Sequence, residues 1–386
     1  SRCLAMMAAL TGNIDVPGGN LITMLRQVPP GPAHSGAAWV TPEQHATRLG
    51  SREYPLLAGE ACVITPSAHN HAVWKAILTG KPYPVKAVYC HGSNMLLSYA
   101  NTQMVSEALK KLDFLVVADL FMTETTRMAD IVLPAASWME RGSVTQNEQT
   151  SIGHFHLQQK TIQRGECRSD ITIINELAKR LGFGERMFPT DESYFDFLLQ
   201  PSGMTFETFK ERGDLAFPHV FRKYESEGFR TPSGKVQLYD QKLEALGYDP
   251  LPAYREPDES PVSTPDLAKE YPLIITTGGR VPVFRHTELR NIPILREIVP
   301  ELEASINPET ARGFGIGDGD IMIVESPRGS MEAKAHITEG IDPRVIQVPS
   351  HWPGMNNVNL LTDNEKCAPM IGSAQLRCQL CRVRTK

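Results

Sequence analysis

The sequence predicts a mixed α/β protein in which a parallel-sheet domain precedes a C-terminal β-barrel domain. Apolar strand patterns alternate with amphipathic helix patterns over residues 61–185, which favours a parallel sheet with crossover helices. Many short strand patterns with one interleaved helix follow over residues 271–386, which favours a closed barrel. A length of 386 residues is enough for two or three domains with their own cores.

Composition and charge exclude several classes of protein. Hydrophobic residues make up 41% and charged residues 22% of the chain, as in ordinary globular proteins. The net charge of −5 gives no indication of nucleic-acid or anionic-membrane binding, and no run of about 18 apolar residues predicts a membrane span. The seven cysteines are scattered, which argues against a disulfide framework. The one CxxC pair, Cys378 and Cys381, lacks the further ligands of a structural zinc or iron–sulfur site.

Residues 1–60 are predicted to be an irregular segment that continues from a missing N-terminal part. Residues 2–10 have the composition of a helix interior, whereas residues 11–20 are rich in turn formers. Residues 27–36 (QVPPGPAHSG) contain too much Pro and Gly for regular structure. The chain begins with Ser1, so we expect a processed product, a fragment or one piece of a larger polypeptide. Its compartment stays open, with the cytoplasm slightly favoured.

The sheet domain is predicted over residues 61–185, where apolar runs of strand length alternate with stretches of helical periodicity. This alternation predicts a parallel, Rossmann-like sheet. The expected elements are, in chain order, a strand at residues 85–89, a helix at 103–111, strands at 115–118 and 129–133, and a helix at 171–181 that Gly182 stops.

Residues 186–270 are predicted to be an excursion and linker, because Pro, Gly and aromatic residues punctuate them. Within them, residues 231–235 predict a turn into a short strand at residues 236–239. The barrel domain at 271–386 has a helix start at Asn307 and Pro308. Its expected strands are at residues 273–277, 321–324, 331–337 and 345–348.

Polar residues follow two neighbouring strands of the predicted sheet. Gly92 and Asn94 stand in the loop after the first strand, and Asp119 and Thr123 come after the second. Ligands bind just past the carboxyl ends of parallel strands. A carboxylate there can accept two hydrogen bonds from a sugar or a guanine edge, and a glycine permits close approach of a phosphate. The alternatives are a plain turn at Gly92 and a turn cap at Asp119.

The stretch of residues 115–141, LVVADLFMTETTRMADIVLPAASWMER, resembles the molybdopterin oxidoreductase family of the dimethyl sulfoxide reductase type. Members bind molybdenum or tungsten through bis-molybdopterin guanine dinucleotide. The resemblance extends over nearly the whole chain and implies a Rossmann-like domain followed by a double-psi β-barrel. It also implies that one dinucleotide is contacted by Asn94, Asp119, Arg141 (in WMER) and Asp170 (in GECRSD). The alternative for Asp170 is the N-cap of the following helix.

Two later segments extend the resemblance. TTGGR at residues 276–280 and FRHT at residues 284–287 resemble the family's TGR…HxHT segment, where Arg and a glycine-rich loop can bind a pyrophosphate. Phe284 stands where the pattern has its first His, and a lone His is more often structural than a ligand. HW and NLLT, at residues 351–352 and 359–362, resemble a late barrel loop that contacts pterin or guanine. The residues implied by these segments are Thr277, Arg280, His286, Thr287, Trp352 and Asn359.

The resemblance implies a missing part. The family's polypeptide begins with a cysteine-rich segment and a domain that supplies the metal ligand, and neither is present. A 4Fe–4S cluster is therefore expected only in the missing N-terminal part, and this chain is expected to be inactive alone. The implied partners are the missing N-terminal half or a chain that carries it, an electron-transfer iron–sulfur subunit and a small-molecule substrate. Nucleic acid is not expected.

The predicted function is two-electron redox or oxygen-atom or hydroxyl transfer at molybdenum or tungsten, with this C-terminal portion binding the guanine dinucleotide tails. KPYPVK at residues 81–86 and TPSGK at residues 231–235 resemble the acetylene hydratase-like branch, so non-redox hydration stays an alternative. A non-catalytic nucleotide-binding scaffold is another. A nicotinamide dehydrogenase is disfavoured because no GxGxxG opens a helix after a strand. No catalytic residue and no metal ligand is assigned; for His154 and His156 a polar strand face is favoured over a metal site.

Overall fold

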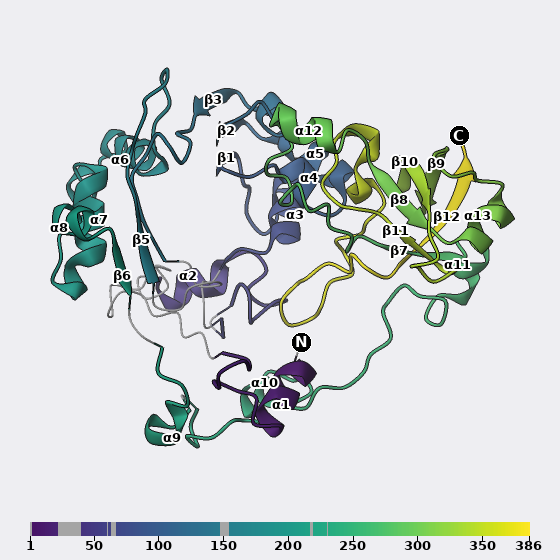
Figure 1. Ribbon diagram of the computed structural model, residues 1–386, viewed down its shortest axis with the longest axis horizontal. Helices are drawn as coiled ribbons and strands as arrows, with labels where there is room; N and C mark the ends of the chain where they lie inside the picture. The colour runs from purple at the N-terminus through teal and green to yellow at the C-terminus, as the bar shows by residue number, and fades with distance from the viewer. Residues whose placement is uncertain are drawn as a thin grey trace. The chain divides into compact units, whose positions relative to one another are not determined.

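The computed structural model describes residues 2–21, 40–59, 61–62, 67–146, 154–216, 219–229 and 231–386 (Figure 1). The irregular segment expected at residues 27–36 lies outside these residues. The chain divides into two compact units. Unit 1 comprises Ser1–His34 and Pro134–Arg255, and unit 2 comprises Ser35–Leu133 and Glu256–Lys386. Each unit therefore joins segments that lie far apart in the sequence.

The first part of unit 2 is a three-stranded sheet of order β1-β2-β3. β1 pairs with β2 in parallel, from Ala87 opposite Phe114 to His91 opposite Ala118. The predicted first strand thus begins two residues later than expected, because its register is set by pairing with β2. The elements of this part are α2 (Pro42–Thr47), α3 (Asn70–Thr79), β1 (Ala87–His91), α4 (Met95–Ser98), α5 (Thr102–Lys111), β2 (Phe114–Asp119), the 3-10 helix η2 (Thr126–Met128) and β3 (Ile131–Pro134).

The crossover helix α5 forms as the sequence predicts. The Asn101 side chain caps it by accepting a hydrogen bond from the Met104 N–H, and two lysines in its last turn are favourable to the helix dipole. Its buried face consists of Val105, Ala108 and Leu109. This face packs with strand residues in one apolar cluster, which fixes the carboxyl ends of β1 and β2 at one edge.

The second part of unit 2 is a closed six-stranded barrel of order β10-β8-β11-β7-β12-β9. Two neighbouring pairs, β8 with β10 and β7 with β11, run parallel. The predicted closed barrel is confirmed, and so is the strand expected at residues 331–337: it lies within β10, where the alternate residues Met331, Ala333 and Ala335 are buried. The barrel part contains α11 (Pro265–Glu270), β7 (Leu273–Thr276), α12 (Pro293–Ile298), β8 (Glu303–Ile306), α13 (Pro308–Phe314), β9 (Ile321–Ser326), β10 (Gly329–Ile337), β11 (Val345–Gln347), the 3-10 helices η5 (Gly354–Asn356) and η6 (Val358–Leu360), and β12 (Gln379–Thr385).

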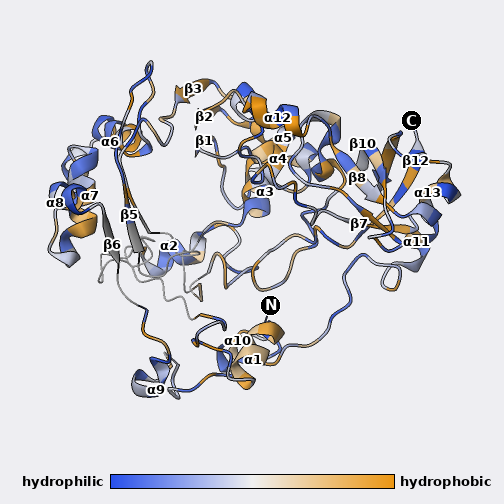
Figure 2. Ribbon diagram, viewed as in Figure 1, coloured by the Kyte–Doolittle hydropathy of each residue, from blue (hydrophilic) through white to orange (hydrophobic). Residues whose placement is uncertain are grey.

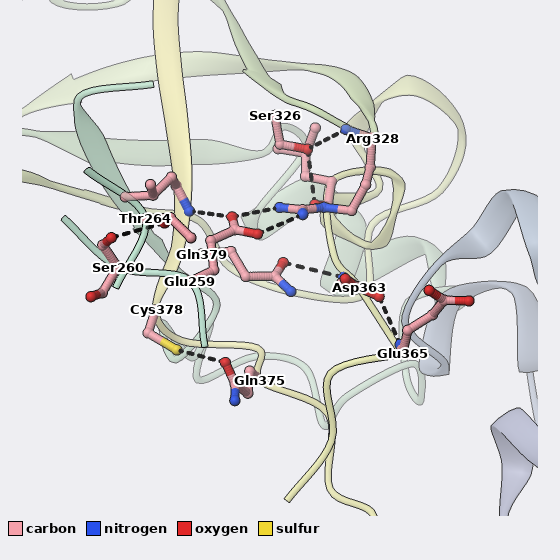
Figure 3. A network of polar contacts seen from close by, with 12 residues as sticks. Glu259, Ser260, Thr264, Ser326, Arg328, Asp363, Glu365, Gln375, Cys378 and Gln379 are labelled. Carbon is pink, nitrogen blue, oxygen red and sulfur yellow. Dashed lines mark hydrogen bonds and ion pairs between the residues drawn. The ribbon is translucent and has the colours of Figure 1, made fainter. Parts of the chain in front are cut away.

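A buried ion pair fixes the chain to the barrel where it enters unit 2 for the second time (Figure 3). Glu259 is 2% exposed and accepts hydrogen bonds from both terminal nitrogens of Arg328, at 2.8 and 2.9 Å. It also accepts one from the Leu380 N–H at 2.7 Å. Arg328 Nε donates in turn to the Leu361 carbonyl at 2.7 Å. The residues predicted as a linker before the barrel are therefore held tightly at this point.

Unit 1 contains a second three-stranded sheet, in which β5 pairs antiparallel with β4 and β6. Its core is made of Phe195, Leu199, Phe206 and Phe209, so aromatic residues of the predicted excursion form a core of their own. The elements of unit 1 are α1 (Arg2–Leu10), β4 (Ser143–Gln146), β5 (His154–Gln158), α6 (Asp170–Arg180), the 3-10 helices η3 (Gly184–Arg186) and η4 (Gln200–Ser202), α7 (Asp191–Leu199), α8 (Phe206–Arg212), β6 (Asp214–Ala216), α9 (Tyr224–Glu227) and α10 (Gln241–Ala245).

Several expectations need correction. The strand expected at residues 236–239 is wrong: the turn before it forms, but no strand pairs with the segment. β8 and α12 were not predicted. The contacts also divide the chain differently from the predicted ranges, because residues 134–185 belong to unit 1. α1 confirms the expected helix, yet none of its residues is buried although it is largely apolar (Figure 2). Within the described ranges, no helix has the length and apolarity needed to cross a membrane.

Candidate functional site

The loops after β1 and β2 lie at one edge of the sheet, as parallel pairing requires. Gly92 has a φ of +57°, and its N–H donates to the Ala118 carbonyl at 3.0 Å, which joins the two strand ends. A side chain at Gly92 would be strained by this φ. No other atom lies within 4 Å of where its Cβ would be. The backbone at Gly92 is therefore accessible at the place where the sequence predicts a ligand.

Asn94 connects the two loops. It is 7% exposed; its Nδ2 donates to Glu124 Oε2 at 2.8 Å, and its Oδ1 accepts from Thr125 Oγ1 at 2.9 Å. Thr125 Oγ1 also accepts from the Leu96 N–H at 3.1 Å. Sequence reasoning missed Glu124 and Thr125, although both directly follow the predicted residue Thr123. Asn94 therefore holds the sheet edge together, and the Glu124 carboxylate is a second acid in the loop after β2.

Asp119 ends β2 in a half-buried position. Burial raises the pKa of its carboxyl, although the backbone N–H groups of Leu120 and Phe121 act in the opposite direction. The Leu120 N–H donates to its Oδ1 at 2.6 Å. Leu120, Phe121 and Met122, which follow directly, are large apolar residues exposed to solvent. A carboxylate beside exposed apolar surface suits a base or ribose, which needs both stacking and hydrogen-bond acceptors.

Thr123 serves the turn itself. It is buried; its hydroxyl forms a hydrogen bond with Thr126 Oγ1 at 2.8 Å and accepts from the Thr126 N–H at 3.2 Å. These contacts hold the turn that leads into η2. In this structure Thr123 therefore shapes the loop, and its predicted contact with a ligand stays a prediction.

The loops after β7 and β11 form a second edge, at one end of the barrel, because these strands are parallel neighbours. Thr277 closes the first loop: its N–H and hydroxyl both donate to the Leu376 carbonyl, at 3.3 and 2.9 Å. Arg280 is exposed and Thr287 half-buried. Thr277 thus stands at this end of the barrel, and the contacts of Arg280 and Thr287 with a ligand stay predictions.

Arg290, which sequence reasoning missed, is the central cation of this edge. Its guanidinium lies 4.5 Å from the ring centre of Phe284 and 4.7 Å from that of Trp352. Nε donates to the His286 carbonyl and Nη2 to the Ser350 carbonyl, each at 2.9 Å. Nη1 is buried and has no hydrogen-bond partner within the described residues. Burial lowers the pKa of Arg290 to about 10, so the group stays charged at neutral pH.

Two histidines lie beside this cation. The rings of His286 and His351 meet edge to face with centres 5.2 Å apart, and both residues have positive φ, 53° and 71°. A hydrogen bond of 2.6 Å joins His351 Nδ1 to Ser350 Oγ. Burial, and then the neighbouring His286 and Arg290, lower the pKa of His351 to about 4. His351 is therefore neutral at pH 7 and can supply either a donor or an acceptor.

Trp352 and Asn359 are buried rather than open. Trp352 is 9% exposed, packs edge to face on Phe284, and has one ring face against Arg290. The Asn359 Nδ2 donates to the Leu97 carbonyl at 2.8 Å, and its Oδ1 accepts from Thr362 Oγ1 at 3.0 Å. The predicted contact of Asn359 with a cofactor stays a prediction, since its amide already bonds this chain on both sides.

The remaining two predicted residues belong to unit 1. Arg141 is half-buried, and its carbonyl accepts from Gln158 Nε2 at 3.4 Å. Asp170 is the first residue of α6, and the alternative that it caps this helix is wrong. Ser169 is the N-cap, because its hydroxyl accepts from the Thr172 N–H at 3.0 Å. The predicted residues thus fall into three groups: the sheet edge, the barrel edge and unit 1.

Burial of one cysteine of the CxxC pair argues against a metal site there. Cys381 lies in the barrel core with no exposed surface, and burial raises the pKa of its thiol, which disfavours the thiolate that metals require. All seven cysteines are unpaired. In the part of the chain that the structure describes, no group of three or more His, Cys, Asp or Glu side chains could hold a metal ion.

Comparisons with known proteins agree with this arrangement. The profile of the molybdopterin oxidoreductase family matches residues 1–180, and that of the molybdopterin dinucleotide-binding domain matches residues 273–378. Acetylene hydratase of Syntrophotalea acetylenica is 36% identical over 313 residues, 75% of this chain and 42% of that protein. Dopamine dehydroxylase of Eggerthella lenta is 27% identical over 471 residues, 97% of this chain and 46% of that protein.

The solved structure of acetylene hydratase from Pelobacter acetylenicus superposes with a TM-score of 0.81 and 30% identity. The match covers 89% of this chain and 52% of that one. The chain spans about half the length of the curated relatives that it matches.

Proposed function

Because the chain belongs to the molybdopterin oxidoreductase family, we propose that it is the C-terminal portion of a molybdenum- or tungsten-dependent oxidoreductase. In this proposal it binds the guanine dinucleotide tails of bis-molybdopterin guanine dinucleotide. The relatives extend to about twice its length, so the metal ligand and a 4Fe–4S cluster are assigned to sequence that this chain does not span. An iron–sulfur electron-transfer subunit is a further proposed partner.

The observation that carries the proposal is the unpartnered donor at the barrel edge. A buried guanidinium N–H without a partner is costly, and a phosphate oxygen is the acceptor that Arg fits best. Arg290 Nη1 is such a donor, and His286 and His351 stand beside it. The residues present therefore fit a pyrophosphate. We propose that this pyrophosphate binds to Arg290 at the barrel edge. Arg280 and the two histidines would donate further hydrogen bonds to it.

The sheet edge also has groups that suit a guanine nucleotide. Asp119 can accept from a ribose or from the N1 and N2 hydrogens of guanine, and the exposed side chains after it offer apolar surface for a base. Gly92 leaves its backbone open to a phosphate. For Arg141 and Asp170, which belong to unit 1, the dinucleotide contact implied by the resemblance stays a prediction. We further propose that the parallel sheet is Rossmann-like and that the barrel has double-psi topology. In support of the latter, the pairs β8–β10 and β7–β11 are parallel, whereas β9–β10, β8–β11, β7–β12 and β9–β12 are antiparallel.

When bound, the cofactor supplies two-electron redox, or oxygen-atom or hydroxyl transfer, at the metal. This chain binds and orients its tails and contributes the charges around them. A second candidate is non-redox hydration, favoured by the 36% identity to an acetylene hydratase and the TM-score of 0.81. A nucleotide-binding scaffold without catalysis is the remaining alternative.

The test is the metal and pterin content of the protein purified without oxygen from cells that make the cofactor. Elemental mass spectrometry measures molybdenum and tungsten, and the fluorescence of oxidised pterin measures the organic part. The proposal expects metal and pterin together, and lower pterin retention in Asp119→Ala and Arg280→Ala. Full pterin occupancy in both variants would contradict the site assignment. Protein that contains neither metal nor pterin, even with its partner chain present, would favour the scaffold.

A further inference from the structure

The sheet part and the barrel part of unit 2 meet along buried asparagines, Asn357, Asn359 and Asn364, which we name the asparagine seam. These side chains are 2%, 4% and 4% exposed. Asn357 Nδ2 donates to the Leu96 carbonyl at 3.0 Å and to Thr102 Oγ1 at 2.9 Å. Asn359 Nδ2 donates to the Leu97 carbonyl, and Asn364 Nδ2 to the Ala100 carbonyl at 3.3 Å. All three amides thus reach from the barrel loop to the segment around α4.

The acceptors on the sheet side are carbonyls in and just after a very short helix. α4 has four residues; its Met95 carbonyl accepts from the Tyr99 N–H, and its Leu96 carbonyl also accepts from Thr102 Oγ1 at 3.1 Å. A buried carbonyl without a donor costs free energy. The asparagine seam supplies donors from the barrel to the Leu96, Leu97 and Ala100 carbonyls. Because the contacts are buried and directional, they fix α4 relative to the barrel loop more strictly than apolar packing alone would.

The seam is also close along the chain to both candidate ligand edges. α4 begins directly after Asn94, which joins the two loops of the sheet edge. Asn357 follows Trp352 by five positions in the loop that carries His351. At the other end of this loop, the Leu361 carbonyl accepts hydrogen bonds from Arg328 Nε and Ser326 Oγ (Figure 3). These two bonds connect the loop to the barrel. Each edge is thus a few residues from the seam.

We propose that Asn357 and Asn359 are positioning residues: they hold the sheet-edge loop at residues 92–94 in a fixed place relative to the barrel-edge loop at residues 350–352, so that the two edges act as one binding surface. The single binding surface in this inference rests on the proposed function, that is, on cofactor binding at the two edges. The inference gives Asn359 a different role from the cofactor contact that the resemblance implies. Whether the two asparagines hold the loops in place can be tested in the protein without ligand.

The chemistry of Asn357 makes a sharp variant available. Its amide donates twice, and its Oδ1 accepts from the Asn359 N–H at 3.0 Å, so three of its hydrogen bonds are made. Asn357→Asp keeps the shape but directs a carboxylate oxygen at the Leu96 carbonyl. Asn357→Ala removes the donor without adding charge and is the milder second variant. The neighbouring Asn356 is the matched control, because its Nδ2 donates to the Glu332 carbonyl of β10 at 2.8 Å and not to α4.

The experiment is hydrogen–deuterium exchange of the whole chain without ligand, followed by mass spectrometry. Asn357→Asp and Asn357→Ala are expected to speed exchange at residues 92–98 by about tenfold or more, the effect of losing a buried hydrogen bond that holds this segment. Exchange in β9 and β10 is expected to stay as in the wild type. Asn356→Asp is expected to leave residues 92–98 unchanged.

Two results would overturn the inference. Unchanged exchange at residues 92–98 in both Asn357 variants would show that the seam does not hold the sheet edge. An equal rise of the exchange rate in β9, β10 and residues 92–98 would show that Asn357 contributes only to the stability of the whole unit. Pterin retention in the protein made with the cofactor is the second readout, expected to fall in Asn357→Ala and not in Asn356→Ala. If the wild type itself holds no pterin, the proposed function fails, while the exchange result still decides whether the seam positions the edge.

Discussion

Replacing Glu259 by Ala removes the carboxylate that anchors the chain to the barrel. The variant leaves Arg328, whose side chain is 20% exposed, without its counter-charge, and leaves the buried Leu380 N–H without an acceptor. Removing one member of a buried ion pair costs about 3 to 5 kcal/mol, mainly because the other charge stays buried. Arg328 is partly exposed and keeps its hydrogen bond to the Leu361 carbonyl, so its charge remains partly compensated. We therefore expect Glu259→Ala to lower the free energy of unfolding by about 4 kcal/mol.

The assay is urea unfolding followed by the fluorescence of Trp352, which lies in the barrel core, in a background without the other tryptophans. The matched control is Glu270→Ala, which removes a carboxylate from Arg382 at 3.1 Å in a pair whose side chains are 60% and 42% exposed. An exposed pair of this kind contributes under about 1 kcal/mol. The double variant Glu259→Met with Arg328→Met is expected to be more stable than Glu259→Ala, because no charge remains buried.

The reasoning is refuted if Glu259→Ala and Glu270→Ala lower the free energy of unfolding equally. The pH dependence gives a second check. Burial by itself raises the pKa of the Glu259 carboxyl, but the hydrogen bonds from Arg328 and Leu380 outweigh it and the pKa is lowered from 4.5. The ion pair therefore stabilises the barrel above pH 4.5, and this contribution is lost as the pH falls below that value.

Two further predictions concern buried titratable groups. Burial, and then Lys75, lower the pKa of His71 to about 4 from 6.5, so the unfolded chain binds the proton first; we expect about 3 kcal/mol of stability to be lost between pH 6.5 and pH 4. In unfolding titrations, His71→Phe should lose less stability over this pH range, whereas His336→Phe, at an exposed position, should behave as the wild type. An equal loss of stability in the wild type and both variants would contradict the role of His71. Burial also raises the pKa of Cys381, so a thiol reagent should label the exposed Cys3 quickly and Cys381 only after unfolding, whereas labelling of native Cys381 would refute its place in the barrel core.

The sequence could predict what depends on local periodicity. The helix α5 and the strand β10 follow from patterns of five or more residues, so both elements were predicted close to their observed positions. β8 has only four residues, so its alternation of exposed and buried side chains is too short to identify a strand; pairing with β10 and β11 makes it one. At residues 236–239 the pattern was present, but no partner strand pairs with it.

Some residues of the candidate site could be predicted from the sequence, and others could not. Asn94 and Asp119 could be placed together from the sequence, since parallel neighbouring strands end at one edge. Arg290 could not, because its surroundings come from Phe284, His286 and Trp352, the last of them 62 positions away along the chain. The internal bonds of Asn359 could not be foreseen either, because they depend on how the barrel loop meets α4.

The central claim is that the barrel edge binds the phosphates of the dinucleotide through Arg290. The most direct measurement is the guanosine monophosphate released by hydrolysis from protein made with its cofactor, compared between Arg290→Met and Arg285→Met. Arg285 stands in the same loop with a side chain 74% exposed, so its variant removes an equal charge from the surface. We predict that Arg290→Met retains about a tenth of the wild-type amount or less and that Arg285→Met retains nearly all of it. Equal retention in both variants, with the fold intact, would contradict the account.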